Sequence, residues 1–280
     1  MNKHHLRITL AAILTVIITG CNEQSKPKTL GEKEIYFNEK LSSVSPDGDS
    51  ACWVGSETGD IWYISANKRR TYNIGTDRIY KVVPDRTADG QQIFWLGIRN
   101  SGLQKWCVKD GQPIMMACYP IAAKGDQYSV YDILTDGDMI YAATSQGLYG
   151  MRRDGTSLTL LYPGATSATA LRGQPMTVSC MCIYNGNLLA GSQDGLIRYN
   201  PHSRKVDVLH RGTPIHCVNS SDGLIYALTD GRLFIDSIAT PSLREVPLTF
   251  PARHHRKIGD THYFIESSHV CLLYTSDAAD

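Results

Sequence analysis

The sequence lacks the features that would identify a hydrolase, a zinc protein or a nucleic-acid-binding protein. No G-x-S-x-G or H-E-x-x-H motif is present, so the usual signatures of nucleophilic and zinc-dependent hydrolysis are missing. No C-x-x-C pair occurs among the eight cysteines, which removes the spacing typical of zinc and redox sites. The net charge is only +1, and no basic patch with interleaved aromatic residues indicates nucleic-acid binding. We therefore expect no catalysis from the chain as given, no cofactor, no metal site and no nucleic-acid partner.

Helical patterns are also scarce, because few long stretches are free of glycine, proline and β-branched residues. What recurs instead is an apolar strand, a polar turn closed by glycine, and a second strand, best seen in residues 89–106. The turn glycines are Gly59, Gly102, Gly147, Gly195 and Gly231, at spacings of 43, 45, 48 and 36 residues. A weaker copy begins at Gly259 and has His269 in place of the turn glycine. This period predicts an all-β fold, a β-propeller of four-stranded blades with five full blades and a truncated sixth.

The strand of the best copy supports face-to-face stacking of blades. Between Ile93 and Ile98 both alternating faces are apolar, so we expect the strand to be covered on both sides. A small residue recurs at one position of this strand, at Gly55, Gly97, Ala143 and Gly191. Such a residue indicates a place where two backbones approach closely.

The first twenty residues are typical of a bacterial export signal. A basic start precedes an apolar run over residues 8–18 that is too short to span a bilayer. Residues 18–21, Ile-Thr-Gly-Cys, resemble a lipobox, and that resemblance implies that Cys21 carries a lipid anchor. The alternative is an ordinary signal peptide with an incidental cysteine. We expect a signal peptide at 1–20, a polar tether at 21–38 and a propeller at 39–270, exported and anchored as a lipoprotein facing the periplasm or the cell surface.

The last ten residues, 271–280, resemble one reading frame of a transposase-based sequencing adaptor. We interpret them as an artefact that interrupts the natural frame near Val270, so that the chain is an N-terminal fragment. A natural end here would leave a blade unfinished, with an exposed strand edge.

The six cysteines between the tether and this tail are compatible with one or two disulfides in an exported protein, but buried strand thiols are favoured. Cys180 and Cys182 lie on one face of a predicted strand, too close along it for a relaxed mutual disulfide. A metal site built from these two thiols and His216 would need a convergence that the sequence does not indicate.

Two stretches carry a family resemblance. Residues 89–103 contain an Asp-Gly turn, the strand Ile-Phe-Trp-Leu-Gly and a following Gly-Leu, and residues 195–201 read Gly-Leu-Ile-Arg-Tyr-Asn-Pro. They resemble the repeat of the two-component regulator propeller family, over about residues 40–270. That resemblance implies the extracytoplasmic sensor region of a Bacteroidetes-type regulator, a non-catalytic input domain coupled to a downstream kinase or regulator module.

The resemblance leaves alternatives open. The first function that we expect is ligand sensing, with a polar small molecule or a glycan as ligand. The second is a cell-envelope lipoprotein that binds a protein or glycan without signalling, because the lipobox departs from the usual family arrangement. The third is a propeller hydrolase or lyase, although eight of the aspartates precede a glycine and are explained by tight turns.

The candidate ligand-binding residues lie in loops that enter the first strand of a blade and in turns between its second and third strands. In a propeller these two sets lie at the same mouth, where polar and aromatic side chains can bind a sugar or a polar peptide. The candidates are Arg78, Arg99, Asn100, Tyr128, Gln146 and Gln193.

Overall fold

The computed structural model describes residues 4–9, 15–19, 32–48, 50–87, 89–121, 128–155, 158–163, 176–236, 244–248, 252–258, 261–265 and 270–274. All regular elements in these ranges are β-strands, joined antiparallel. The same ranges hold no helix with the length and apolar character needed to cross a membrane. The chain divides into two compact units, Met1–Ile133 and Leu134–Asp280.

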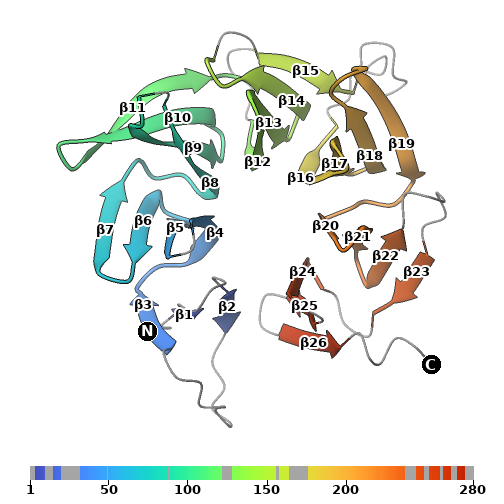
Figure 1. The fold of residues 1–280 in the computed structure, drawn as a ribbon, viewed down its shortest axis with the longest axis horizontal. Helices are drawn as coiled ribbons and strands as arrows, with labels where there is room; N and C mark the ends of the chain where they lie inside the picture. The colour runs from blue at the N-terminus through green and yellow to red at the C-terminus, as the bar shows by residue number, and fades with distance from the viewer. Residues whose placement is uncertain are drawn as a thin grey trace. The chain divides into compact units, whose positions relative to one another are not determined.

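The first unit holds one three-stranded and two four-stranded sheets, each built from strands that are neighbours along the chain (Figure 1). The three-stranded sheet has the order β2(Thr15–Thr19), β1(His4–Thr9), β3(Glu32–Phe37). The next sheet consists of β4(Leu41–Asp47), β5(Ala51–Ser56), β6(Asp60–Ser65) and β7(Lys68–Asn73). The third consists of β8(Ile79–Arg86), β9(Gln92–Ile98), β10(Gly102–Lys109) and β11(Gln112–Tyr119).

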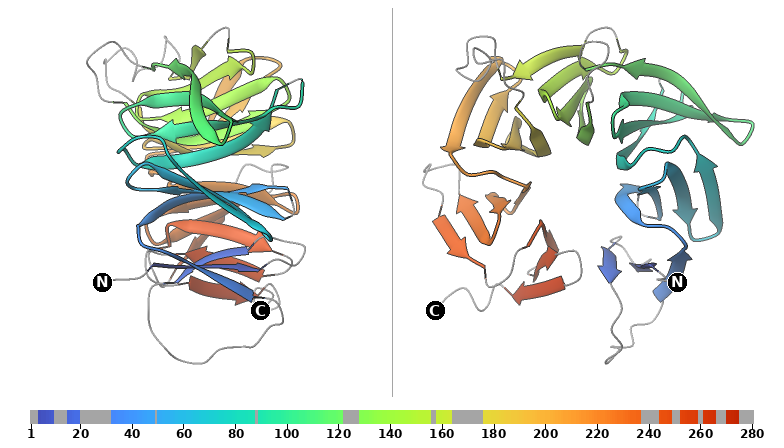
Figure 2. Two further views of the ribbon diagram at one scale, coloured as in Figure 1. Left: turned by 90° about the vertical axis from the view of Figure 1, so that its left-hand side faces the viewer. Right: turned by 180° about the vertical axis from the view of Figure 1, so that it is seen from behind.

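The second unit continues in the same way (Figure 2). Its first sheet is β12(Val130–Asp136), which begins in the first unit, with β13(Met139–Thr144), β14(Gly147–Arg152) and β15(Leu158–Tyr162). Then come β16(Val178–Tyr184), β17(Asn187–Ser192), β18(Gly195–Asn200) and β19(Lys205–Arg211). The last two sheets are β20(Cys217–Ser221), β21(Leu224–Thr229), β22(Arg232–Asp236), β23(Arg244–Pro247), and the three-stranded β24(His254–Ile258), β25(Thr261–Ile265), β26(Val270–Tyr274).

The prediction of fold class is confirmed. Five four-stranded antiparallel sheets follow one another in chain order, and a three-stranded sheet stands where the sixth blade was expected. This succession of similar sheets is a β-propeller.

The structure has strands in two N-terminal segments where the sequence did not indicate any. Strands β1 and β2 lie within the segment expected to be a signal peptide, and β3 lies within the expected tether. Phe37, at the end of β3, is only 2% exposed because its ring packs on Trp62 at 4.9 Å. Strand β26 likewise covers four residues of the tail expected to be an artefact. The processing of the N-terminus and the origin of the tail stay predictions.

The double covering expected for β9 is confirmed, since every residue from Ile93 to Ile98 is buried. Phe94 lies in a cluster with Trp53 of β5, their ring centroids 4.9 Å apart. The apolar residues of β9 therefore contribute to stacking between successive sheets, at about 25 cal/mol for each Å² of apolar surface removed from water.

The recurring small residue also has the predicted cause. A Cβ added to Gly97 would lie 2.6 Å from the carbonyl oxygen of Val130, in the first strand of the next sheet. A Cβ at Gly55 would meet Ile79 at 2.9 Å, and one at Gly191 would meet the Ile215 carbonyl oxygen at 2.8 Å. In each case an aliphatic residue at the start of the next sheet's first strand, or just before that strand, lies directly over the small residue. We call Ile79, Val130 and Ile215 the anchor residues.

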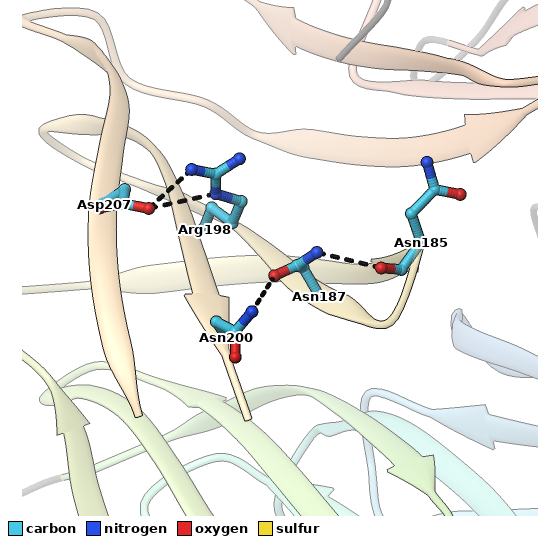
Figure 3. A network of polar contacts seen from close by, with 5 residues as sticks. All are labelled: Asn185, Asn187, Arg198, Asn200 and Asp207. Atoms are coloured by element: carbon cyan, nitrogen blue, oxygen red, sulfur yellow. Dashed lines mark hydrogen bonds and ion pairs between the residues drawn. The ribbon is translucent and has the colours of Figure 1, made fainter. Parts of the chain in front are cut away.

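The residues that carried the family resemblance at 195–201 have structural roles (Figure 3). Arg198 donates two hydrogen bonds to Asp207 Oδ2, at 3.3 and 2.7 Å, across the β18–β19 pair. Asn200 Nδ2 donates to Asn187 Oδ1 at 3.0 Å and thereby joins the ends of β17 and β18. Because these side chains are committed to their own sheet, we do not place them in a binding site.

The close approach at Gly97 predicts a specific loss of stability. We expect Gly97→Ala to lower the free energy of unfolding by about 1–3 kcal/mol, because the new methyl group meets backbone that cannot move without displacing a strand. Gly150→Ala is the matched control, since there a Cβ meets first the Cδ1 atom of Leu161, the end of a flexible side chain, at 2.8 Å. Urea denaturation of both variants measures the difference, and equal midpoints would contradict this account of the stacking.

Candidate functional site

The candidate site is a cluster of polar and aromatic residues in the first unit, where β8, the β9–β10 turn and the start of β12 meet. The rings of Tyr80 and Tyr131 are in edge contact, with centroids 5.0 Å apart. The Arg78 guanidinium lies over the Tyr80 ring at 5.1 Å from its centroid. We call Arg78, Tyr80, Arg99, Asn100, Ser129 and Tyr131 the tyrosine cluster.

A β-bulge positions Tyr80. The pairing of β8 with β9 shifts between Ile79 and Lys81, so Tyr80 is the extra residue. A bulge of this kind re-aims the side chain of the residue that it leaves unpaired. Sheets β4–β7 and β16–β19 have a bulge at the same place, where the extra residues are Ser42 and Ser179.

These serines differ from Tyr80 in what they do. Ser179 Oγ donates to the carbonyl oxygen of Ile215 at 3.0 Å, and Ser42 Oγ donates to the carbonyl oxygen of Ile79. Each thus links its sheet to the anchor residue of the next. Tyr80 instead contacts Tyr131, the residue after the next anchor, Val130. The tyrosine cluster therefore lies where other sheets use a hydrogen bond between sheets.

The turn between β9 and β10 is connected to Tyr131 by hydrogen bonds. Asn100 adopts a φ of 57°, and its backbone N–H donates to Ser129 Oγ at 3.4 Å. Ser129 is buried, and its hydroxyl is also hydrogen-bonded to the Tyr131 side chain. On the other side of the turn, the Arg99 N–H donates to the Arg78 carbonyl oxygen at 2.9 Å. Both exposed residues of the turn, Arg99 and Asn100, are thereby held beside the two tyrosines.

Charges of both signs surround these rings. Arg78 Nη1 lies 3.4 Å from Glu57 Oε1, and Lys81 Nζ lies 3.0 Å from Asp132 Oδ1. Burial raises the pKa of Tyr131, Tyr80 raises it further, and the hydrogen bond from Ser129 and the charge of Arg99 oppose the shift. The Tyr131 hydroxyl therefore stays protonated at neutral pH and can donate hydrogen bonds. Arginine guanidinium groups, phenols and a carboxamide are groups that bind sugars and polar peptides.

The structure brings three of the predicted site residues together. Arg78, Arg99 and Asn100 belong to the tyrosine cluster. Tyr128 lies against Gly102, where a Cβ would be 2.6 Å from its ring, so its ring packs on the turn.

The remaining candidates lie elsewhere in the chain. Gln146 and Gln193 belong to the second unit, and their backbone N–H groups donate to Thr144 Oγ1 and the Thr177 carbonyl oxygen, each at 3.0 Å. Cys21 lies outside the described residues. All six ligand-binding assignments and the lipid assignment stay predictions.

Sequence reasoning missed Ser129 and Tyr131. The signal for Tyr131 was present, because it follows Val130 as Tyr80 follows Ile79. Tyr131 could be recognised only by aligning Ser42 and Ser179 with Tyr80 and Tyr131. The bulges add an extra residue to these strands and hide that alignment in the sequence.

The six internal cysteines are thiols, as the sequence favoured, but only Cys52 and Cys107 are buried, whereas Cys118 is exposed and the other three are half-buried. Burial raises the pKa of Cys52 to about 11, which makes its thiolate inaccessible at neutral pH. Cys180 and Cys182 pack on the same apolar cluster, in keeping with one shared strand face. Among the residues that the structure describes, no group of three His, Cys, Asp or Glu side chains is arranged to hold a metal ion.

Comparison with known proteins identifies the fold and no family. No family model matches the chain, and no curated protein matches it either. One similar solved structure is the extracellular domain of BT4673 from B. thetaiotaomicron, described as a one-component system, at 15% identity and a TM-score of 0.63. The match covers 83% of this chain but only 32% of that one. Another is the WD40 β-propeller domain of Doa1, at 12% identity and a TM-score of 0.64, covering 96% of this chain and 88% of that one.

The left-handed turn residue Asn100 allows a test of how the cluster is positioned. We expect Asn100→Ala to lower stability by about 1 kcal/mol, because alanine tolerates a positive φ less well than asparagine, whereas Asn100→Gly should be neutral or slightly stabilising. Thermal unfolding of the two variants measures this. If both variants behave alike, the turn does not depend on its left-handed residue.

Proposed function

We propose that this chain is the extracytoplasmic ligand-sensing propeller of a two-component-type regulator, a non-catalytic input domain that binds a polar small molecule or glycan. The observation that carries the proposal is the tyrosine cluster, in which two arginines, an asparagine and two phenols from three segments meet at one edge. The likeness in fold to an extracellular domain of a signalling protein supports the same reading. Export and lipidation at Cys21 are part of this proposal.

The chemistry of the cluster favours binding over catalysis. A glycosidase needs two carboxyl groups flanking the scissile bond, one of them kept protonated. Here Glu57 and Asp132 are each engaged in an ion pair, with Arg78 and Lys81 respectively, so their oxygens are already used in structural contacts. The arginines and phenols of the cluster can bind hydroxyl or carboxylate groups.

Calorimetric titration of the full chain with two probes tests ligand binding. The probes are a tetramer of galacturonic acid, which carries carboxylates, and maltotetraose, which is neutral. We expect at least one to bind, and Arg99→Ala and Tyr131→Ala each to weaken that binding roughly tenfold or more, because hydrogen bonds to charged groups contribute about 1.5–3 kcal/mol.

Arg198→Ala is the matched control for this titration, since Arg198 is committed to Asp207 and lies in the second unit. It should bind as the parent chain does. Failure of both probes, or an equal loss in Arg99→Ala and Arg198→Ala, would remove the glycan assignment.

The signalling part of the proposal has its own test, which is to sequence the source DNA past the codon for Val270. We expect the frame to continue into a membrane span and a kinase or DNA-binding module. A stop codon soon after the sixth sheet closes would overturn the signalling role and leave a lipoprotein that binds without signalling.

A further inference from the structure

Two histidines of the last sheet occupy positions that are apolar core in the other sheets. His255 pairs with Phe264 and lies three residues after Ala252, as Val218 lies three residues after the anchor Ile215. The equivalent residues are Val82, Ile133, Met181 and Val218, all no more than 6% exposed, and His255 itself is 4% exposed. His262 lies two residues before Phe264, and its equivalents Phe94, Leu188 and Ile225 are fully buried.

The hydrogen bonds around this pair determine where each proton resides. Asn219 Nδ2 donates to the His255 carbonyl oxygen at 2.5 Å, so Asn219 Oδ1 is the atom that faces His255 Nδ1, at 3.2 Å. Because a carbonyl oxygen only accepts, His255 Nδ1 carries a proton. In a neutral ring Nε2 is then an acceptor, and it lies 2.9 Å from His262 Nδ1, which must donate.

This arrangement limits the uptake of protons. A proton added to His255 Nε2 would oppose the proton on His262 Nδ1. The contact would survive only if His262 moved its proton to Nε2, so that Nδ1 could accept a hydrogen bond. The contact can therefore hold one added proton, shared between the rings, but not two, because two N–H groups would then oppose each other. The two rings also stack on each other at 5.1 Å and contact Tyr226 at 4.7 and 5.2 Å.

The surroundings disfavour even the first added proton. Burial, which is the largest cause, and the nearby His262, Arg256 and Lys257 together lower the pKa of His255 to about 3. Burial and Lys257 also lower the pKa of His262, with Asp222 opposing. Asp222 accepts a hydrogen bond from Lys257 Nζ, so its charge is partly neutralised. Tyr226, which contacts both rings, is neutral because burial raises its pKa.

We infer that the His255–His262 pair makes the packing of the β24–β25 hairpin on β20–β21 acid-sensitive, so that the hairpin separates from its neighbour as the pH falls below about 6.5. The sign follows from linkage. A histidine in the separated hairpin titrates near 6.5, while the packed pair resists protonation, so packing is fully favourable above about 6.5 and is lost progressively below it. An extracytoplasmic protein meets such a pH, whereas the apolar equivalents in the other sheets confer no such response.

Hydrogen exchange of the full chain, resolved to peptides and corrected for the intrinsic pH dependence of exchange, tests the inference. Between pH 7.5 and pH 5 we expect the opening of residues 252–265 to increase by up to about tenfold for each pH unit and each proton taken up, while peptides of β16–β18 stay unchanged. His255→Val with His262→Ile restores the residue types of the other sheets and should abolish the response.

Two further variants keep the test decisive if that double variant folds poorly. His262→Asn places an amide where Nδ1 lies and removes one titrating ring, so it should reduce the steepness of the response. His202→Asn replaces an exposed histidine of the same unit and should leave it unchanged. The inference is overturned if the opening of 252–265 is independent of pH, or if His262→Asn and the double variant keep the full response.

Discussion

The rest of the structure depends on the close approach of one sheet to the next. An anchor residue such as Val130 lies directly over Gly97, with no room for a methyl group between them. This contact sets the register of each first strand against the preceding sheet. It also forces the covered strand to be apolar on both faces, which is why Ile93–Ile98 is buried throughout. A chain that repeats this contact forms a β-propeller almost regardless of what its turns contain.

The same contact determines where functional residues can lie. With the anchors held, the extra residue of the bulge in a first strand lies beside the start of the following sheet. Ser42 and Ser179 use that place for a hydrogen bond to the next anchor, whereas Tyr80 uses it for contact with Tyr131. The tyrosine cluster therefore replaces the serine hydrogen bond that two other sheets use at this place, while the close contact between sheets is kept.

Much of the fold could be predicted from the sequence, because its signals are local and repeat. The turn glycines adopt positive φ, from 73° at Gly231 to 135° at Gly147, so each had to be glycine at a recurring place. Strand β3 was not predicted, because its strand-type residues are only Ile35, Tyr36 and Phe37 and charged residues precede them. Only part of the candidate site was predicted from the sequence. Arg99 and Asn100 were among the predicted ligand-binding residues. Tyr131 and Ser129 were not, because they act through contacts between distant strands and the bulges shift the alignment of the repeats.

A residue that differs from its equivalents in the other sheets is informative, because it gives up a stabilising contact that the other sheets keep. Replacing a bridging serine by tyrosine gives up a hydrogen bond to the next anchor, and placing imidazoles where valine and isoleucine pack gives up apolar burial and exposes the sheet to acid. Four other sheets have apolar residues at the same positions, so packing of the sheets does not require histidines there. In a repeat protein that otherwise follows its own pattern closely, residues that break the pattern without a structural gain are the first places to test for a function.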